Sequence, residues 1–169
     1  AVNDVYAATY AVRSQQVDFA ISSLSVTRER TRDLYFSDGY ILGQSPHGVL
    51  MRMKHRSAPS GEKPRLGVPQ ASVHSQFAED NLRNDFCVRT FRNGRLAFEG
   101  LRSGLVDHLL LHPTWLDYFP SESAGVEICS KPYRYKSHTG ILFHRDSMDW
   151  VKPVNKAIEM IFEAQSHEA

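Results

Sequence analysis

A six-residue pattern occurs twice in this sequence and limits the folds that the chain can adopt. Arg13–Asp18 and Arg102–Asp107 share the letters R-S-x-x-V-D, each followed by apolar residues, and the two copies lie 89 residues apart. Each copy has the pattern of a helix end, a tight turn and a strand that begins at Val-Asp. Two copies are too few for a solenoid, so they predict two similar α/β lobes. A chance match of two Val-Asp strands is the alternative.

Short apolar runs alternate with helical patterns along the rest of the chain, which indicates βα units and a mostly parallel sheet. The last helix has an apolar face at Val151, Val154, Ile158 and Ile161, and it begins near Ser147 or at Pro153. Helices are expected at 72–82 and 96–102, with short turns opening at 27 and 114. Strands are expected at 17–21, which should be buried, and at 48–53, 65–68, 86–91, 106–111, 126–129 and 139–144.

The charge balance and hydropathy exclude several classes of protein. Lys and Arg number 20 and Asp and Glu 19 among 169 residues, so the net charge is close to zero. A nucleic-acid-binding protein would be expected to have an excess of positive charge. No apolar run approaches the roughly 18 residues of a membrane span. The 41% hydrophobic content is enough for a buried core. These features predict a globular protein whose partners do not include nucleic acid.

Cysteine and histidine give no metal or redox signature. Cys87 and Cys129 lack a second CxxC, and two buried free thiols are the preferred interpretation over a disulfide. His108 and His112 are four residues apart, but the run between them is a predicted strand, so a helical metal pair is not expected. No G-x-S-x-G, H-E-x-x-H or P-loop pattern occurs. We therefore expect no metal, no cofactor and no catalytic residue.

A serine-rich turn after the first predicted strand is the strongest candidate for binding chemistry. Ser22, Ser23 and Ser25 place hydroxyl and backbone N–H groups at a sheet edge, and Thr27 caps a helix whose first turn holds Arg30. A guanidinium beside such groups suits bidentate capture of a carboxylate. The alternative is that the serines only form turns and Arg30 is a solvated helix residue.

The order of motifs along the chain resembles a known family. VDFAISSLSVTRER at 17–30, with YFSDGY at 35–40, is similar to the central motif of family 3 of the bacterial extracellular solute-binding proteins, the amino-acid receptors of ABC importers. LGVPQASV at 66–73 resembles the segment that opens the family's second lobe. LRSGLVD at 101–107, the strand at 139–145 and VNKAI at 154–158 follow in the family's order. The resemblance extends over residues 10–162.

The resemblance implies an α/β fold of the type II periplasmic-binding class, with two Rossmann-like lobes joined by hinge strands. The first lobe would comprise residues 1–47 and 140–169, and the second residues 48–139. The family's first lobe normally opens with a strand, a helix and another strand before the helix that precedes Val17, so the first lobe is expected to be incomplete. An uncovered edge in that lobe favours a homodimer or a strand-swapped dimer.

The family's ligand contacts can be carried over residue by residue. The resemblance implies that Arg30 binds a ligand carboxylate, that Ser22, Ser23 and Ser25 hydrogen-bond the ligand, and that Ser72 and the N–H of Val73 hold the other carboxylate oxygen. His112 stands where the family places an acidic residue for the ligand α-ammonium. Asp117 is an alternative for that role. Two further departures, Gly39 and Ala71, replace the family's proline and glycine.

The resemblance implies a periplasmic protein that captures an amino acid or related organic acid for the membrane permease of an ABC importer. Any signal peptide would lie outside this chain. Two alternatives share the fold. The chain could be the ligand-sensing input module of a receptor, or a dehydratase-like enzyme, for which Glu99 and Glu122 are the candidate carboxylates near the second lobe.

Overall fold

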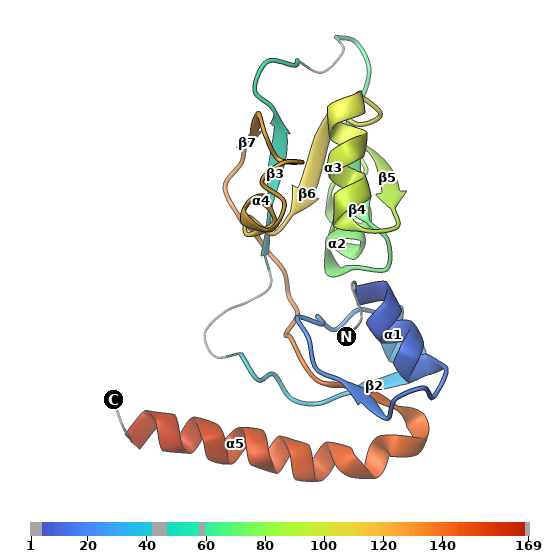
Figure 1. The fold of residues 1–169 in the computed structure, drawn as a ribbon, viewed down its shortest axis with the longest axis vertical. Coiled ribbons are helices and arrows are strands. Elements are labelled where there is room, and N and C mark those ends of the chain that lie inside the picture. The colour runs from blue at the N-terminus through green and yellow to red at the C-terminus, as the bar shows by residue number, and fades with distance from the viewer. Residues whose placement is uncertain (1–4, 42–46, 58–59, 168–169) are drawn as a thin grey trace. The chain divides into compact units, whose positions relative to one another are not determined.

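The computed structural model describes residues 5–41, 47–57 and 60–167. These residues form two compact units. Unit 1 combines the described residues up to 41 with those from 136 onwards, and unit 2 comprises the described residues of 47–135. Each unit has its own sheet (Figure 1).

Unit 2 is built on a mixed six-stranded sheet. Its strands have the order β5-β4-β6-β3-β7, and β8 pairs with β3. β4 is parallel to β5 and β6, whereas β3 is antiparallel to β6, β7 and β8. The strands are β3 (His47–Met53), β4 (Arg65–Pro69), β5 (Cys87–Phe91), β6 (His108–Leu111), β7 (Val126–Ile128) and β8 (Tyr133–Arg134).

Two helices cover the two faces of this sheet. Successive residues of a strand point to opposite faces, and β6 accordingly places Leu109 and Leu111 in one apolar cluster and Leu110 in another. The first cluster includes Phe98 of α3 (Gly94–Ser103) and the second Ala78 of α2 (Val73–Asn81). A short helix, α4 (Trp115–Tyr118), follows β6. Unit 2 therefore has three layers, with the sheet between the helices.

Unit 1 has a smaller antiparallel sheet of order β1-β9-β2. Helix α1 packs on it, and Val12, Leu24, Leu34 and Leu142 form its buried cluster. The last strand leads through a 3₁₀ segment into the long C-terminal helix (Figure 1). The elements are α1 (Val5–Arg13), β1 (Phe19–Ala20), η1 (Arg30–Arg32), β2 (Leu34–Phe36), β9 (Leu142–His144), η2 (Arg145–Trp150) and α5 (Val151–His167).

The α/β fold class is confirmed, but three expectations are wrong. The sheets are not mostly parallel, because β3, β7 and β8 run against their neighbours and unit 1 is antiparallel throughout. Residues 17–21 are not a buried strand, since only Phe19 and Ala20 pair and Phe19 is 48% exposed. On the last helix Ile158 is buried, whereas Ile161 is 56% exposed.

The two cysteines lie at opposite edges of the sheet of unit 2. Cys87 begins the edge strand β5, and Cys129 follows β7 at the other edge. Both thiols are free and exposed, so the expectation that they are buried is wrong. Within the described residues, none of the helices combines the length and apolar character that crossing a membrane requires.

Candidate ligand-binding site

The serine turn of unit 1 is held by backbone hydrogen bonds and leaves two of its side chains exposed. The carbonyl of Ser22 accepts bonds from the N–H of Leu24, at 2.6 Å, and from the hydroxyl of Tyr40. Ser25 is buried and forms a β-bridge with Thr139. Ser22 and Ser23 are exposed. The turn therefore presents two hydroxyl groups on a segment that is anchored at both ends.

Arg30 lies buried beneath this turn. Its guanidinium Nη1 donates to the Ser25 carbonyl at 2.6 Å, and its backbone N–H donates to the hydroxyl of Thr27 at 3.3 Å. Only 2% of Arg30 is exposed, so the alternative of a solvated helix residue is wrong. Burial, which disfavours the charged form, lowers the pKa of Arg30 to about 10, and nearby Glu29 opposes this shift. Arg30 is therefore a buried cation at neutral pH.

The two candidate residues at the start of α2 serve the helix itself. The Ser72 hydroxyl accepts a hydrogen bond from the N–H of Ser75 at 3.1 Å and donates to the Pro69 carbonyl at 2.6 Å. The Ser75 hydroxyl in turn accepts a hydrogen bond from the backbone N–H of Ser72, which completes a capping box. Val73 is the first helical residue and is buried. Ala71, just before the cap, has a φ of 51°, in the left-handed region.

His112 follows β6, and its hydrogen bonds define which ring nitrogen carries the proton. The backbone N–H of Thr114 donates to His112 Nδ1 at 3.3 Å, and the Thr114 hydroxyl lies 2.7 Å from the same atom. Nδ1 is thus an acceptor and Nε2 carries the proton. The ring packs on His47, with centroids 4.4 Å apart. Burial, together with His47, lowers the pKa of His112, which favours the neutral ring.

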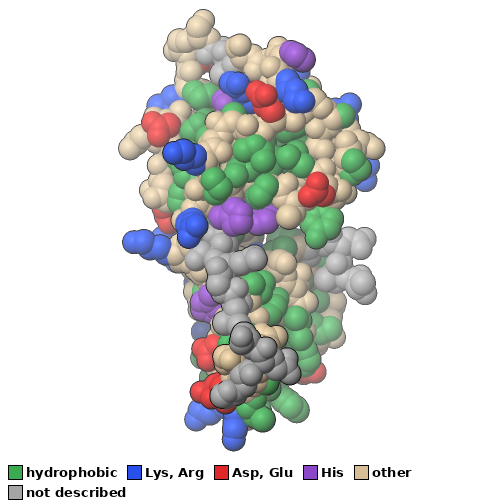
Figure 2. All heavy atoms as spheres, turned by 90° about the vertical axis from the view of Figure 1, so that its left-hand side faces the viewer, with side chains coloured by type: hydrophobic (Ala, Val, Ile, Leu, Met, Phe, Trp, Pro, Cys, Tyr) green, Lys and Arg blue, Asp and Glu red, His purple; other side chains and the backbone are tan. Residues whose placement is uncertain are grey.

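A group of three histidines around His112 was not expected from the sequence. His74 lies in the first turn of α2, and its Nδ1 is 2.7 Å from the hydroxyl of Tyr135. Burial, with smaller contributions from His112 and His47, lowers the pKa of His74 to about 3. Figure 2 shows histidine side chains gathered on unit 2 beside an apolar surface. The three rings come from distant positions in the chain, so no local pattern could reveal them.

The histidine group is not a metal site. Within the described residues, no three or more His, Cys, Asp or Glu side chains are arranged to hold a metal ion. The group lies where the parallel strands β4 and β6 end, at Pro69 and Leu111. Ligands of open α/β sheets bind beyond such carboxyl ends. Ser72, Val73 and His112 therefore lie at the end of the unit 2 sheet where a ligand is expected.

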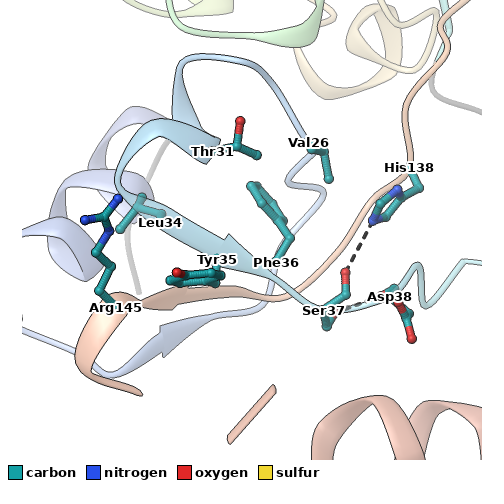
Figure 3. Close-up of a pocket in the computed structure, with 9 residues that line it drawn as sticks. All are labelled: Val26, Thr31, Leu34, Tyr35, Phe36, Ser37, Asp38, His138 and Arg145. Atoms are coloured by element: carbon teal, nitrogen blue, oxygen red, sulfur yellow. Dashed lines mark hydrogen bonds between the residues drawn. The ribbon is translucent and has the colours of Figure 1, made fainter. Parts of the chain in front are cut away.

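Unit 1 also has a hollow of about 390 Å³ that no sequence motif indicated. Figure 3 shows the His138 ring directed at the Ser37 carbonyl, with a distance of 3.3 Å. Arg145 at the other end donates to the Arg32 carbonyl at 2.9 Å. The side chains of His138 and Arg145 thus contact backbone atoms of unit 1. None of the residues predicted to bind ligand lines it.

Comparisons with known proteins are consistent with this architecture. The family model described as bacterial extracellular solute-binding proteins, family 3, matches residues 3–169. The glutamine-binding protein GlnH of an ABC transporter from Bacillus subtilis (strain 168) is 24% identical over 152 residues. That match covers 88% of this chain but only 54% of GlnH, so the chain spans about half the length of this relative.

Two solved structures show the same fold at lower identity. A periplasmic His/Glu/Gln/Arg/opine family-binding protein from Silicibacter pomeroyi, in complex with lysine, has a TM-score of 0.77 and 14% identity, covering 98% of this chain and 73% of that one. An ancestral arginine-binding protein bound to glutamine has a TM-score of 0.74 and 21% identity, covering 98% and 74%. The predicted type II periplasmic-binding fold is confirmed. This chain belongs to family 3 of the bacterial extracellular solute-binding proteins.

Proposed function

We propose that this chain binds a small carboxylate-bearing solute, an amino acid or a related organic acid, and delivers it in the periplasm to the permease of an ABC importer. The observation that carries the proposal is Arg30, a buried cation bonded to Ser25 directly behind an exposed pair of serines. The family to which the chain belongs supports this solute-binding function, and so does its glutamine-binding relative.

The chemistry of unit 1 suits one carboxylate. An Arg guanidinium has several donors in a fixed fork, which matches the two oxygens of a carboxylate. Arg30 is 2% exposed and its Nη1 donates to the Ser25 carbonyl, so we expect a ligand carboxylate to compete with that carbonyl. We therefore propose that the turn from Ser22 to Ser25 shifts on binding, and that the hydroxyls of Ser22 and Ser23 donate to the ligand.

The chemistry of unit 2 suits oxygen atoms rather than an ammonium group. We propose that the N–H of Val73 at the start of α2 donates to the ligand, with Ser72 holding that end of the helix in place. His112 has its proton on Nε2, so it donates there and does not accept. A ligand oxygen is its natural partner. This favours a ligand with a second oxygen-bearing group, in the place where the family's acidic residue binds an ammonium.

We propose that the solute is released unchanged, so that no residue is catalytic. The two carboxylates considered for an enzyme, Glu99 and Glu122, both lie beside Arg95, at 3.7 and 3.1 Å. Both carboxylates are thus engaged by the same guanidinium, whereas a general acid must reach the substrate to transfer its proton.

We also propose that the chain pairs with a second copy through unit 1. β1 and β2 are both edge strands of a three-stranded sheet, and edge strands readily pair with other chains. Phe19 is 48% and Ile21 61% exposed beside one of these edges. Unit 1 thus has both open edges and exposed apolar side chains, which a second copy would cover.

Titration calorimetry on the full chain tests the binding proposal, with L-glutamine, L-arginine and dicarboxylic acids as probes. Replacing Arg30 with Ala should weaken binding by about 2–5 kcal/mol, because a buried charge-assisted contact is lost. Arg30→Lys should also weaken binding, since the fork is lost. Arg32→Ala, an exposed neighbour, is the matched control. Equal affinity in the unaltered chain and in folded Arg30→Ala would refute the role of Arg30.

A further inference from the structure

The C-terminal helix α5 carries its charges in an order that is unfavourable for a single helix. Lys152 and Lys156 lie in its first half, and Glu159 and Glu163 in its second half. A helix dipole favours acidic residues near the start and basic residues near the end, so this order is reversed. Both pairs are also like charges four residues apart, which repel one another. Lys156 and Glu159, three residues apart, are of opposite charge, but this one contact is outweighed by the two like-charge pairs and the reversed dipole order.

The described residues of unit 1 offer no ion-pair partner to these four charges. Among the residues that the structure describes, none of the four takes part in an ion pair. All four side chains are exposed. They line an open groove of about 900 Å³ that runs along α5 beside Asp38 and Gly39. Space is therefore available beside the charged flank of the helix.

An exposed apolar stripe lies next to this charged flank. Ala157, Met160, Ile161 and Ala164 follow the spacing i, i+3, i+4, i+7, which places them on one side of a helix. Met160 is 60% and Ile161 56% exposed. The helix attaches to unit 1 through a different face, where Ile158 is buried. The lower part of Figure 2 shows hydrophobic side chains exposed among charged ones.

We propose that α5 of one copy packs antiparallel against α5 of a second copy through this stripe. In an antiparallel pair related by a two-fold axis, each flank faces the same flank of the partner in reverse order. Lys156 of one copy then faces Glu163 of the other, and the reverse pair forms at the opposite end. A parallel pair would instead place these flanks on opposite sides of the seam, so that Lys156 and Glu163 could not face one another. The order of charges that is unfavourable within one α5 helix is therefore complementary between two antiparallel α5 helices.

The seven-residue spacing supports the same arrangement. Lys156 and Glu163 are seven residues apart and directly precede Ala157 and Ala164, so they share the heptad position beside the seam. Lys152 and Glu159 are also seven residues apart but lie farther from the seam. This inference rests on the dimer proposed above and names α5 as its interface. It does not depend on ligand binding. It requires only α5 of unit 1, so failure to bind a solute would leave it intact.

Charge reversal on the full chain provides the test, with sedimentation velocity at micromolar concentration and low salt as the measurement. An acidic variant carries Lys152→Glu and Lys156→Glu, and a basic variant carries Glu159→Lys and Glu163→Lys. Each variant alone should repel itself and raise the dimer dissociation constant by about tenfold or more. An equal mixture of the two should associate again. The variant with all four reversals should dimerise like the unaltered chain.

A control variant distinguishes the effect of the α5 charges on dimerisation from the effect of the total net charge. Lys54→Glu with Lys131→Glu makes the same change of charge on unit 2 and should leave the dimer intact, and circular dichroism shows that each variant is folded. A monomeric unaltered chain would overturn both this inference and the proposed pairing. A dimer that neither charge variant weakens would overturn the α5 surface and favour the strand edges. Failure of the mixture to associate would also overturn it.

Discussion

Gln15 and Gly104 occupy the same place in the two units, each just after a helix and each in the left-handed region, with φ of 57° and 80°. The backbone bonds around them also correspond at the same 89-residue offset. Val17 N donates to Ala11 O, as Val106 N donates to Gly100 O, both at 3.3 Å. The repeated R-S-x-x-V-D pattern therefore adopts the same helix-turn-strand conformation in both units.

This relationship predicts the cost of a side chain at Gly104. Gly104→Ala should destabilise the chain by about 1–2 kcal/mol, because a residue with a Cβ is strained in the left-handed region. The added Cβ would meet only the flexible end of Arg56, at 3.2 Å, so the backbone rather than a clash sets the cost. Urea unfolding measures the effect, and Ser103→Ala, one residue earlier, should stay within about 0.5 kcal/mol. Equal effects of the two substitutions would contradict this explanation.

The opposite change is predicted at Ala71. Its φ of 51° is suited to glycine, which stands here in the family that the chain resembles. Ala71→Gly should raise the free energy of unfolding by about 1 kcal/mol. The same substitution at Ala78, buried within α2, should lower it by at least about 1 kcal/mol. Thermal unfolding of both variants checks the sign, and a loss of stability at Ala71 would count against strain there.

Features set by neighbouring residues could be predicted from the sequence. The helix after Ser72 begins at Val73 and ends beside Leu82 as expected, because a serine cap and its bonding partner lie within four residues. Thr27 accepts the N–H of Arg30 for the same local reason.

Features set by distant residues could not. The direction of β3 depends on its pairing with β6 and β7, which no local pattern encodes. Residues 17–21 are apolar enough for a buried strand, but Phe19 and Ala20 form an edge strand that pairs with β9 alone. The contact between His47 and His112 joins positions that are 65 residues apart. The burial of Arg30 likewise depends on the fold of the turn above it.

Acid should weaken unit 2 through Asp107. Its carboxylate accepts two bonds from the Arg65 guanidinium, at 2.7 and 3.0 Å, and one from the Arg65 N–H at 2.8 Å. These bonds hold the pKa of Asp107 below its ordinary value. Because the folded pKa is lowered, the stabilisation is complete above the unfolded pKa of about 4 and is lost as the pH falls through the folded value.

Urea unfolding between neutral pH and pH about 2 measures this dependence. Asp107→Asn should be less stable than the unaltered chain at neutral pH, and the difference should shrink as the pH falls below about 4. Asp85→Asn, at an exposed position of the same unit, should leave the free energy of unfolding almost unchanged both at neutral pH and at low pH. A difference that is constant with pH would show that the Arg65 pair does not set the pKa.

His112 should govern which solutes bind. Its Nε2 proton donates and cannot pair with an ammonium group, so His112→Asp should strengthen binding of L-glutamine or L-arginine by about tenfold through one charge-assisted bond. His55→Asp makes the same change of charge at an exposed position and should have no such effect. Calorimetry compares the variants. Tight binding of these amino acids by the unaltered chain would contradict a selective role for His112.

Native mass spectrometry of the full chain tests the role of Arg30 most directly, since it shows whether a small molecule travels with the protein. We expect a small carboxylate-bearing solute to be retained by the unaltered chain, released by acid and identified in the released fraction. Folded Arg30→Ala should carry none, whereas Arg32→Ala should carry the same molecule. A carboxylate solute retained equally by Arg30→Ala, or none bound by the unaltered chain after incubation with amino and dicarboxylic acids, would contradict it.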